Sequence, residues 1–277
     1  MDEIMEKLLV QSNKFKNLSE LFKIEPGFAF IAGPCSIESP EQMELVAQIL
    51  MKNNVQFIRG GAYKPRTSPY DFQGLGLEGL KILDNIRKKY HLKVVSEIMD
   101  PRDIEAGMKY TDMIQIGSRN MQNYSLLKEA GKTKHPVLLK RGMMSTVKEF
   151  LLAAEYIVSN GNENLVLCER GIRSFDSNTR NILDIACIAQ IKQQTKLPLV
   201  VDLSHSLGRK DILLPIAKAI LAIQVDAIML ELHPDPEHAL SDNQQQLLFA
   251  EFDSFYHQIS QFIKIIEQYK ENPSEGN

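Results

Sequence analysis

Short apolar segments alternate with helix-like segments along nearly the whole chain, and this alternation constrains the fold more than any other feature. The apolar runs have the length and the content of Val, Ile and Leu typical of buried strands. They lie at residues 28–33, 55–60, 93–98, 112–117, 136–142, 164–171, 198–205 and 226–233. Segments with helical periodicity follow near residues 40–52, 75–90, 101–110, 121–131, 145–159, 176–195, 211–223 and 242–268.

Near-continuous apolar strands separated by helices indicate a parallel sheet that is covered by helices. Eight such units in roughly 240 residues fit a single (β/α)8 TIM barrel best, and an open doubly wound sheet is the alternative. We expect an N-terminal extension over residues 1–26, the catalytic barrel over 27–270 and a disordered tail over 271–277. The Gly-x-Gly-x-x-Gly match at 74–79 follows a long loop instead of a strand, so it does not indicate a dinucleotide site.

Composition and charge exclude several classes of protein. The net charge of −3 and the pI of about 6.1 argue against a nucleic-acid-binding surface. The sequence has no apolar run long enough to cross a membrane and no secretory signal pattern at its acidic start, which predicts a cytoplasmic protein. The cysteines at 35, 168 and 187 are odd in number and scattered, which predicts reduced thiols.

Charged residues gather where the predicted strands end. In a barrel the chemistry is carried at the C-terminal ends of the strands, so these side chains should face one rim. A rim rich in Arg and Lys predicts a substrate with several negative charges, because Arg binds carboxylates and phosphates in a bidentate manner. The rim residues are Arg59, Glu97, Arg119, Lys140, Arg141, Glu169, Arg170, Arg173 and Asp202.

The segment Phe57–Gly74 has the features of an anion-binding loop. It places Arg59, Lys64 and Arg66 within eight positions, with Thr67 beside them. Two prolines in the loop fix the backbone and prevent it from continuing as a helix or strand. A stiff cationic loop directly after a strand is therefore a candidate binding site.

A second constellation has the residue types of a metal site. Cys35, His205, Glu231 and Asp242 offer a thiolate, an imidazole and two carboxylates, which suit a divalent transition metal. The first three follow strands that are neighbours around a closed barrel. Each also has a structural interpretation: Cys35 as a small buried hydrophobe, His205 as a core hydrogen-bonding group and Asp242 as a helix cap.

The sequence allows more than one role for two further polar residues. Lys140 is a candidate general acid or Schiff-base amine, but a fixed positive charge needs the fewest assumptions. His233 lies in a rigid polar turn beside Glu231, and a structural role is favoured.

Seven motifs in the sequence resemble those of one enzyme family. IAGPCSIES, GGAYKPRTSPYDFQGLG, QIGSRNMQN, LLKRGM, CERGIR, VDLSH and ELHPDPEHALSD are similar to motifs of the type I, β-subgroup synthases of 3-deoxy-D-arabino-heptulosonate 7-phosphate (DAHP). The resemblance covers about residues 27–250. Lys-Pro-Arg-Thr-Ser at 64–68 is specific, because the related octulosonate 8-phosphate synthases carry an Asn-Arg-Ser-Ser version of this loop.

The resemblance implies the first step of the shikimate pathway, an aldol-like condensation of phosphoenolpyruvate with erythrose 4-phosphate that releases phosphate. It also implies a divalent transition metal, and a cysteine ligand favours Mn, Fe, Co or Zn over Mg. The implied metal ligands are Cys35, His205, Glu231 and Asp242. The implied phosphoenolpyruvate ligands are Arg59, Lys64, Arg119, Lys140 and Arg170.

The resemblance also implies which residues bind the phosphate of the aldose and which residues take part in catalysis. Arg66 and Thr67 would bind the phosphate of the aldose. Lys64, Cys35 and His205 are the implied catalytic residues, with Lys64 delivering a proton to the new alkoxide. A homo-oligomer, dimer or tetramer, is expected.

The sequence departs from the family pattern in two respects. Leu203-Ser204-His205 replaces Pro-Ser-His and is followed by Ser206-Leu207, so we expect this loop to sit differently and to change metal affinity or rate. An added ferredoxin-like or chorismate mutase domain is not recognisable, which predicts no intrinsic inhibition by aromatic amino acids or chorismate. Two alternatives remain: a paralogue that uses another aldose phosphate, including the octulosonate type, and a non-catalytic binding or regulatory barrel.

Overall fold

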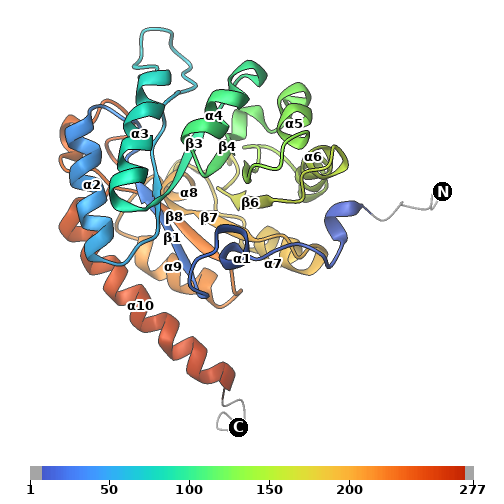
Figure 1. The fold of residues 1–277 in the computed structure, drawn as a ribbon. Coiled ribbons are helices and arrows are strands. Elements are labelled where there is room, and N and C mark those ends of the chain that lie inside the picture. The colour runs from blue at the N-terminus through green and yellow to red at the C-terminus, as the bar shows by residue number, and fades with distance from the viewer. Residues whose placement is uncertain (1–7, 272–277) are drawn as a thin grey trace.

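The computed structural model describes residues 8–271 and is built around a closed barrel of eight parallel strands (Figure 1). The barrel closes between its first and last strands, which pair from Ala29 with Ala227 to Gly33 with Glu231. The predicted (β/α)8 barrel is therefore confirmed, and the open doubly wound sheet is excluded. Within residues 8–271 no helix is both long and apolar enough to cross a membrane.

All eight predicted strands are present, and each is shorter than predicted. They are β1 (Ala29–Gly33), β2 (Phe57–Arg59), β3 (Lys93–Glu97), β4 (Met113–Ile116), β5 (Val137–Lys140), β6 (Leu165–Glu169), β7 (Leu199–Asp202) and β8 (Ala227–Glu231). The α-helices are α1 (Leu18–Phe22), α2 (Pro40–Lys52), α3 (Leu77–Tyr90), α4 (Ile104–Tyr110), α5 (Tyr124–Gly131), α6 (Val147–Ser159), α7 (Ile185–Gln194), α8 (Leu203–Leu207), α9 (Leu213–Leu221) and α10 (Phe249–Glu271). Short 3₁₀ helices are η1 (Leu9–Gln11), η2 (Pro101–Asp103), η3 (Ser118–Asn120) and η4 (Pro236–His238).

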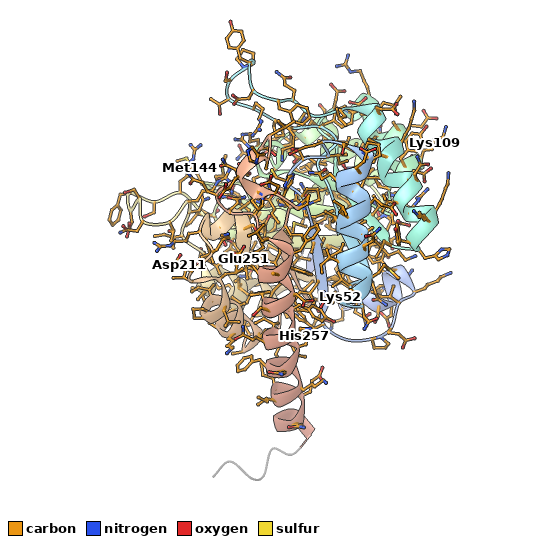
Figure 2. All side chains as sticks on the ribbon, turned by 90° about the vertical axis from the view of Figure 1, so that its left-hand side faces the viewer. Lys52, Lys109, Met144, Asp211, Glu251 and His257 are labelled. Atoms are coloured by element: carbon orange, nitrogen blue, oxygen red, sulfur yellow. The ribbon has the colours of Figure 1, made fainter. Side chains whose placement is uncertain are left out.

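The helices cover the outside of the barrel, and local signals mark several of their ends. The Ser39 side chain accepts a hydrogen bond from the Gln42 backbone N–H, and Pro40 occupies the first turn of α2, as the sequence predicted. The first and last helices of the barrel are linked by an ion pair of 3.0 Å between Lys52 and Asp253. Figure 2 shows α2 and α10 side by side on this face.

Three predicted boundaries are wrong because capping or turn residues interrupt the predicted element. The strand predicted at 198–205 ends at Asp202, because the Asp202 side chain caps the short helix α8 by accepting the His205 backbone N–H. The helix predicted at 176–195 begins only at Ile185, after the capping residue Asp184. The helix predicted at 242–268 begins at Phe249. In each case short polar side chains form turns or caps where apolar periodicity suggested a regular element.

Alternate residues of each strand point into the barrel and divide its interior into an apolar part and a polar part. The apolar interior cluster consists of Ala29, Ile31, Phe57, Val95, Met113, Leu138, Val166, Cys168, Val200, Ala227 and Met229, together with Leu18 and Phe22 of α1. Two residues further along six strands, the inward positions are Arg59, Glu97, Gln115, Lys140, Asp202 and Glu231. The barrel is therefore filled with hydrophobic side chains below and ends in a buried polar layer.

The N-terminal segment closes the opposite end of the barrel. The buried ring of Phe22 packs edge-on against Phe57, with ring centroids 4.9 Å apart. Upstream, the backbone N–H groups of Leu9 and Val10 each donate to the Glu155 carboxylate at 3.0 Å. Within the described residues, the predicted extension is thus packed on the barrel. Residues 1–7 and most of the predicted tail, 272–277, lie outside the described residues.

Replacing Phe22 with alanine should lower the free energy of unfolding by about 3–5 kcal/mol, because it removes a buried ring from the bottom of the barrel. Urea denaturation followed by circular dichroism measures the change. Phe175→Ala is the matched control, since the Phe175 ring is fully exposed and its loss should cost less than about 0.5 kcal/mol. An equal loss of unfolding free energy in the two variants would contradict the claim that the packing of α1 stabilises the bottom of the barrel.

Candidate active site

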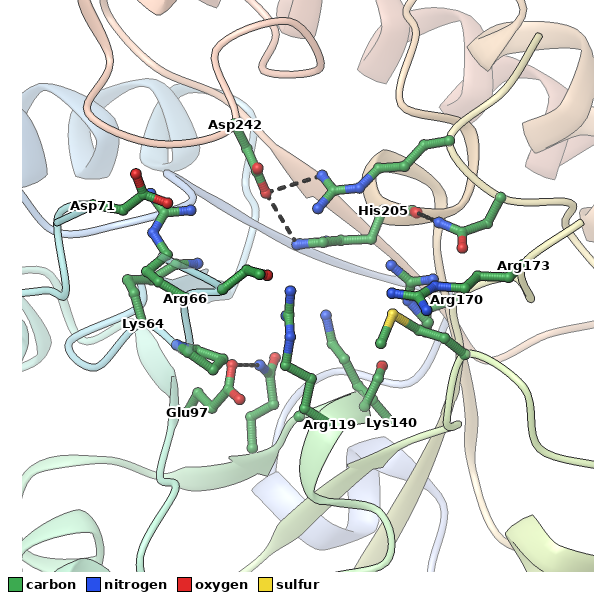
Figure 3. Close-up of a pocket in the computed structure, with 18 of the residues that line it drawn as sticks. Lys64, Arg66, Asp71, Glu97, Arg119, Lys140, Arg170, Arg173, His205 and Asp242 are labelled. Carbon is green, nitrogen blue, oxygen red and sulfur yellow. Dashed lines mark hydrogen bonds and ion pairs between the residues drawn. The ribbon is translucent and has the colours of Figure 1, made fainter. Parts of the chain in front are cut away.

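A cavity of about 330 Å³ opens above the polar layer, at the C-terminal ends of the strands (Figure 3). Its floor contains inward residues of the strands, and its walls come from the loops that follow β2, β4, β5, β6, β7 and β8. Eight cationic side chains and three carboxylates line the cavity. The cations are Arg59, Lys64, Arg66, Arg119, Lys140, Arg170, Arg173 and Arg180.

This excess of cations lies in a chain whose overall charge is negative, as the strand-end pattern predicted. Arg119 lies on η3, is exposed and makes no ion pair within the described part of the chain. Arg170 is buried, and its side chain donates only to the Gly171 carbonyl among described groups, at 3.3 Å. Burial, with Arg180 nearby, lowers the pKa of Arg170. Cations with few carboxylate partners are suited to bind an anionic ligand.

Four potential metal ligands converge at one side of the cavity. One ligand atom from each of Cys35, His205, Glu231 and Asp242 lies within 4.8 Å of the others. The Asp242 Oδ2 atom lies 3.3 Å from the Cys35 sulfur and 3.6 Å from His205 Nε2. His205 Nε2 lies 3.5 Å from Glu231 Oε1. The structure thus brings together the four residues that the sequence singled out.

These separations fit a metal ion. Ligands about 2.0–2.3 Å from a common tetrahedral centre lie about 3.3–3.8 Å apart, which matches the three measured distances. Burial and the Glu231 carboxylate raise the pKa of the Cys35 thiol to about 12. A divalent cation would reverse this effect, because a coordinating thiol is deprotonated. The donor set therefore suits a transition metal, and a sulfur ligand disfavours Mg²⁺.

Buried ion pairs connect the polar layer to this cluster. The Arg59 guanidinium donates to Glu231 Oε1 at 2.5 Å, and both side chains are almost fully buried. Lys64 donates from its ammonium to the Cys35 sulfur at 2.9 Å and to the Cys35 carbonyl at 3.1 Å. Lys64 therefore contacts a candidate metal ligand and also lines the cavity.

Lys140 at the end of β5 is held by Asp202 at the end of β7, the strands on either side of β6 in the barrel. The Lys140 ammonium forms an ion pair with Asp202, and the same carboxylate lies 2.8 Å from His205 Nδ1. Burial opposes ionisation of Asp202, yet His205 and Lys140 hold its pKa well below the usual range. Asp202 thereby fixes a cation that faces the cavity and orients the imidazole. This favours the fixed-charge interpretation of Lys140.

The loop that follows β2 reaches over the cavity with its remaining polar groups. Arg66 lines the cavity and is anchored by donating to the carbonyl oxygens of Phe72 at 3.0 Å and Leu240 at 3.3 Å. Thr67 also lines the cavity and is exposed. In Figure 3, Lys64 and Arg66 lie on the same side of the cavity, across from Arg170 and Arg173.

Two predicted roles differ from the structure, those of Arg141 at the rim and of Asp242 as a helix cap, whereas the role favoured for His233 agrees with it. Arg141 is buried away from the cavity lining, where its Nη1 forms ion pairs of 3.0 Å with Glu169 and Asp184. Asp242 does not cap a helix, because it lies in a loop with a positive φ of 49°. His233 accepts a hydrogen bond from the Asp235 backbone N–H and lies 3.4 Å from Glu38, which agrees with a structural role.

The loop with the altered sequence after β7 is held firmly by the barrel. Leu203 is completely buried, and the Ser204 hydroxyl accepts a hydrogen bond from the Glu231 backbone N–H at 2.8 Å. The leucine thus anchors the turn that carries His205 by hydrophobic packing. The expected effect on metal affinity or rate stays a prediction.

Sequence reasoning missed several polar residues of the site because they were assigned to helices. Arg180 and Asn181 line the cavity from the segment before α7, and Gln245 lies in the loop before α10. The signal was present in both segments: Asp176-Ser177-Asn178 and Ser241-Asp242-Asn243 are runs of turn-forming residues. Asp176 does form such a local turn, accepting the Asn178 backbone N–H at 2.8 Å.

The chain belongs to the DAHP synthetase I family, whose family model matches residues 25–268. A phospho-2-dehydro-3-deoxyheptonate aldolase of Thermotoga maritima is 50% identical over 225 residues, which make up 81% of this chain and 67% of the relative. The family consists of transferases, and this chain is an enzyme of that class.

Two solved structures that match this chain are also DAHP synthases. A crystal structure of the Thermotoga maritima DAHP synthase matches with a TM-score of 0.83 at 47% identity, covering 86% of this chain and 70% of that one. A truncated form of the enzyme matches with a TM-score of 0.80 and 43% identity, covering 86% and 87%. A 2-dehydro-3-deoxyphosphooctonate aldolase of Syntrophotalea carbinolica is more distant, with 30% identity over 79% of this chain and 84% of the relative.

Proposed function

We propose that this protein is a metal-dependent DAHP synthase that condenses phosphoenolpyruvate with erythrose 4-phosphate and releases phosphate. The observation that carries the proposal is a cluster of four candidate metal ligands, two of which, His205 and Asp242, line a cavity that eight cations also line. Phosphoenolpyruvate carries a carboxylate and a phosphate on one carbon skeleton, so it needs several converging cations. The metal would supply Lewis-acid activation of the aldehyde oxygen of the aldose.

Six of the eight cations that line the cavity have a place in this reaction. We assign Arg59, Lys64, Arg119, Lys140 and Arg170 to phosphoenolpyruvate, and Arg66 and Thr67 to the phosphate of the aldose. A carbon–carbon bond forms when C3 of phosphoenolpyruvate attacks C1, the aldehyde carbon, of erythrose 4-phosphate. Water then adds to C2 of the former phosphoenolpyruvate, which has become cationic. The C2–O bond to phosphate breaks, leaving a ketone. The fixed cations stabilise the charge that develops at the carboxylate and the departing phosphate.

Lys64 is the proposed source of the proton for the new alkoxide oxygen. Its ammonium lies beside Cys35, so an aldehyde oxygen directed toward the metal ligands comes within reach of the Lys64 protons. A water molecule supplies the oxygen of the product ketone, and the overall reaction consumes one water for each phosphate released.

The decisive assay is phosphate release from phosphoenolpyruvate plus erythrose 4-phosphate, measured with and without exhaustive chelation. We expect activity that chelation abolishes and that Mn²⁺ or Co²⁺ restores. Cys35→Ala should reduce activity by at least about 100-fold at any metal concentration, because a ligand is lost. Full activity after chelation, or in Cys35→Ala, would contradict the metal assignment.

The octulosonate aldolases among the relatives define the second candidate. Their eight-carbon product requires a five-carbon aldose phosphate, one carbon longer than erythrose 4-phosphate. A substrate panel with four- and five-carbon aldose phosphates should show a preference for the four-carbon sugar. A preference for a five-carbon sugar would favour the paralogue, and phosphoenolpyruvate binding without turnover of any sugar would favour a non-catalytic barrel.

Arg66→Ala separates the two anion subsites. It removes a cation assigned only to the aldose phosphate, so KM for erythrose 4-phosphate should rise about 10- to 100-fold, as for loss of a charged hydrogen bond of roughly 1.5–3 kcal/mol. KM for phosphoenolpyruvate should stay within about twofold. Arg102→Ala is the control, because within residues 8–271 its exposed guanidinium pairs only with Asp100. The reverse pattern of KM values would overturn the assignment.

The cytoplasmic location, the homo-oligomer and the lack of inhibition by aromatic amino acids or chorismate stay predictions. An inhibition constant in the micromolar range on the purified chain would contradict the last of these.

A further inference from the structure

Three consecutive glutamines in the loop between β8 and α10 have different environments. Gln244 is exposed, whereas Gln245 and Gln246 are almost completely buried. A buried amide has both a donor and an acceptor to satisfy, so its partners indicate what the side chain holds in place.

Gln245 contacts two of the four candidate metal ligands. Its Nε2 donates to Glu231 Oε2 at 2.5 Å and to Asp242 Oδ2 at 3.4 Å. The other oxygen of Glu231, Oε1, faces His205 Nε2 at 3.5 Å. Gln245 on Oε2 and Arg59 on Oε1 therefore fix the rotation of the Glu231 carboxylate between them, with Oε1 on the side of His205.

Arg180 determines which way the Gln245 amide points. Its Nη1 donates to Gln245 Oε1 at 2.6 Å and lies 3.1 Å from Asp242 Oδ2. A guanidinium has no acceptor, so the amide oxygen must face Arg180 and the amide nitrogen must face the carboxylates. The flipped amide would place its oxygen against the Glu231 carboxylate.

Gln246 anchors the loop independently of Gln245. Its Oε1 accepts the Cys35 backbone N–H at 3.0 Å, and its Nε2 donates to the Ser241 carbonyl at 2.8 Å. The Leu247 backbone N–H also donates to the Glu231 carbonyl at 2.9 Å. These bonds keep the loop on the barrel when the Gln245 side chain is changed.

We propose that Gln245, oriented by Arg180, is a positioning residue that holds Glu231 and Asp242 in the arrangement needed to coordinate a divalent metal. This role rests on the proposed metal-dependent function and adds to it residues that do not themselves coordinate. Hydrogen-bonding partners of metal ligands fix the ligands' orientation, and their removal typically weakens metal affinity by about 10- to 100-fold.

The test compares Gln245→Leu with Gln244→Leu in the metal-free protein. Leucine has nearly the volume of glutamine but cannot donate to the carboxylates, and Gln244 is the matched control because it is exposed in the same loop. We expect Gln245→Leu to weaken Co²⁺ binding by about 10- to 100-fold and to change the visible spectrum of bound Co²⁺. Gln244→Leu should match the wild type in both measurements.

Two further measurements separate positioning from a loss of structure. The Tm of the metal-free Gln245→Leu protein and its affinity for phosphoenolpyruvate without metal should equal those of the wild type, since the loop anchors and the cations assigned to phosphoenolpyruvate are unchanged.

The outcomes are distinguishable. Co²⁺ affinity and spectrum of Gln245→Leu equal to the wild type would overturn the positioning role and leave the proposed function intact. Equal weakening in both variants, or weakening accompanied by a lower Tm of the metal-free protein, would also overturn it. Failure of the wild type to bind Co²⁺ would overturn the metal site itself and the positioning role with it.

Discussion

The alternation of side chains along eight parallel strands is the constraint on which the site depends. Because every second residue points inward, the residue two positions after a buried apolar side chain reaches the same interior one layer higher. Phe57 is followed in this way by Arg59, Leu138 by Lys140 and Val200 by Asp202. The hydrophobic filling and the charged floor are thus consecutive layers of one barrel. A shift of one residue in any strand would place its charge outside the barrel.

Four of the five charged residues in the polar layer form two ion pairs, because an unpaired buried charge is costly. Arg59 with Glu231 and Lys140 with Asp202 are both almost fully buried. Such pairs contribute little net stability, since desolvation offsets most of their attraction. Their consequence is functional: they hold cations and candidate metal ligands in fixed positions beside a cavity in which Arg119 and Arg170 have few partners.

The sequence predicted the barrel because eight buried strands produce eight apolar runs, a pattern that does not depend on tertiary detail. It also brought together Cys35, His205, Glu231 and Asp242, since strand order places the ends of β1, β7 and β8 side by side. The loops before α7 and α10 were not predicted, because their few apolar residues continue the helical spacing. Arg180 and Gln245 were missed for this reason. Arg141 was misplaced because sequence position identifies the end of a strand but not the direction of the side chain that follows it.

The most direct test is anomalous diffraction from crystals grown with Mn²⁺ and phosphoenolpyruvate. We predict a single strong anomalous peak within coordination distance of Cys35, His205, Glu231 and Asp242, with phosphoenolpyruvate in contact with Arg119, Lys140 and Arg170. A metal bound elsewhere, or phosphoenolpyruvate bound outside this cavity, would contradict the account.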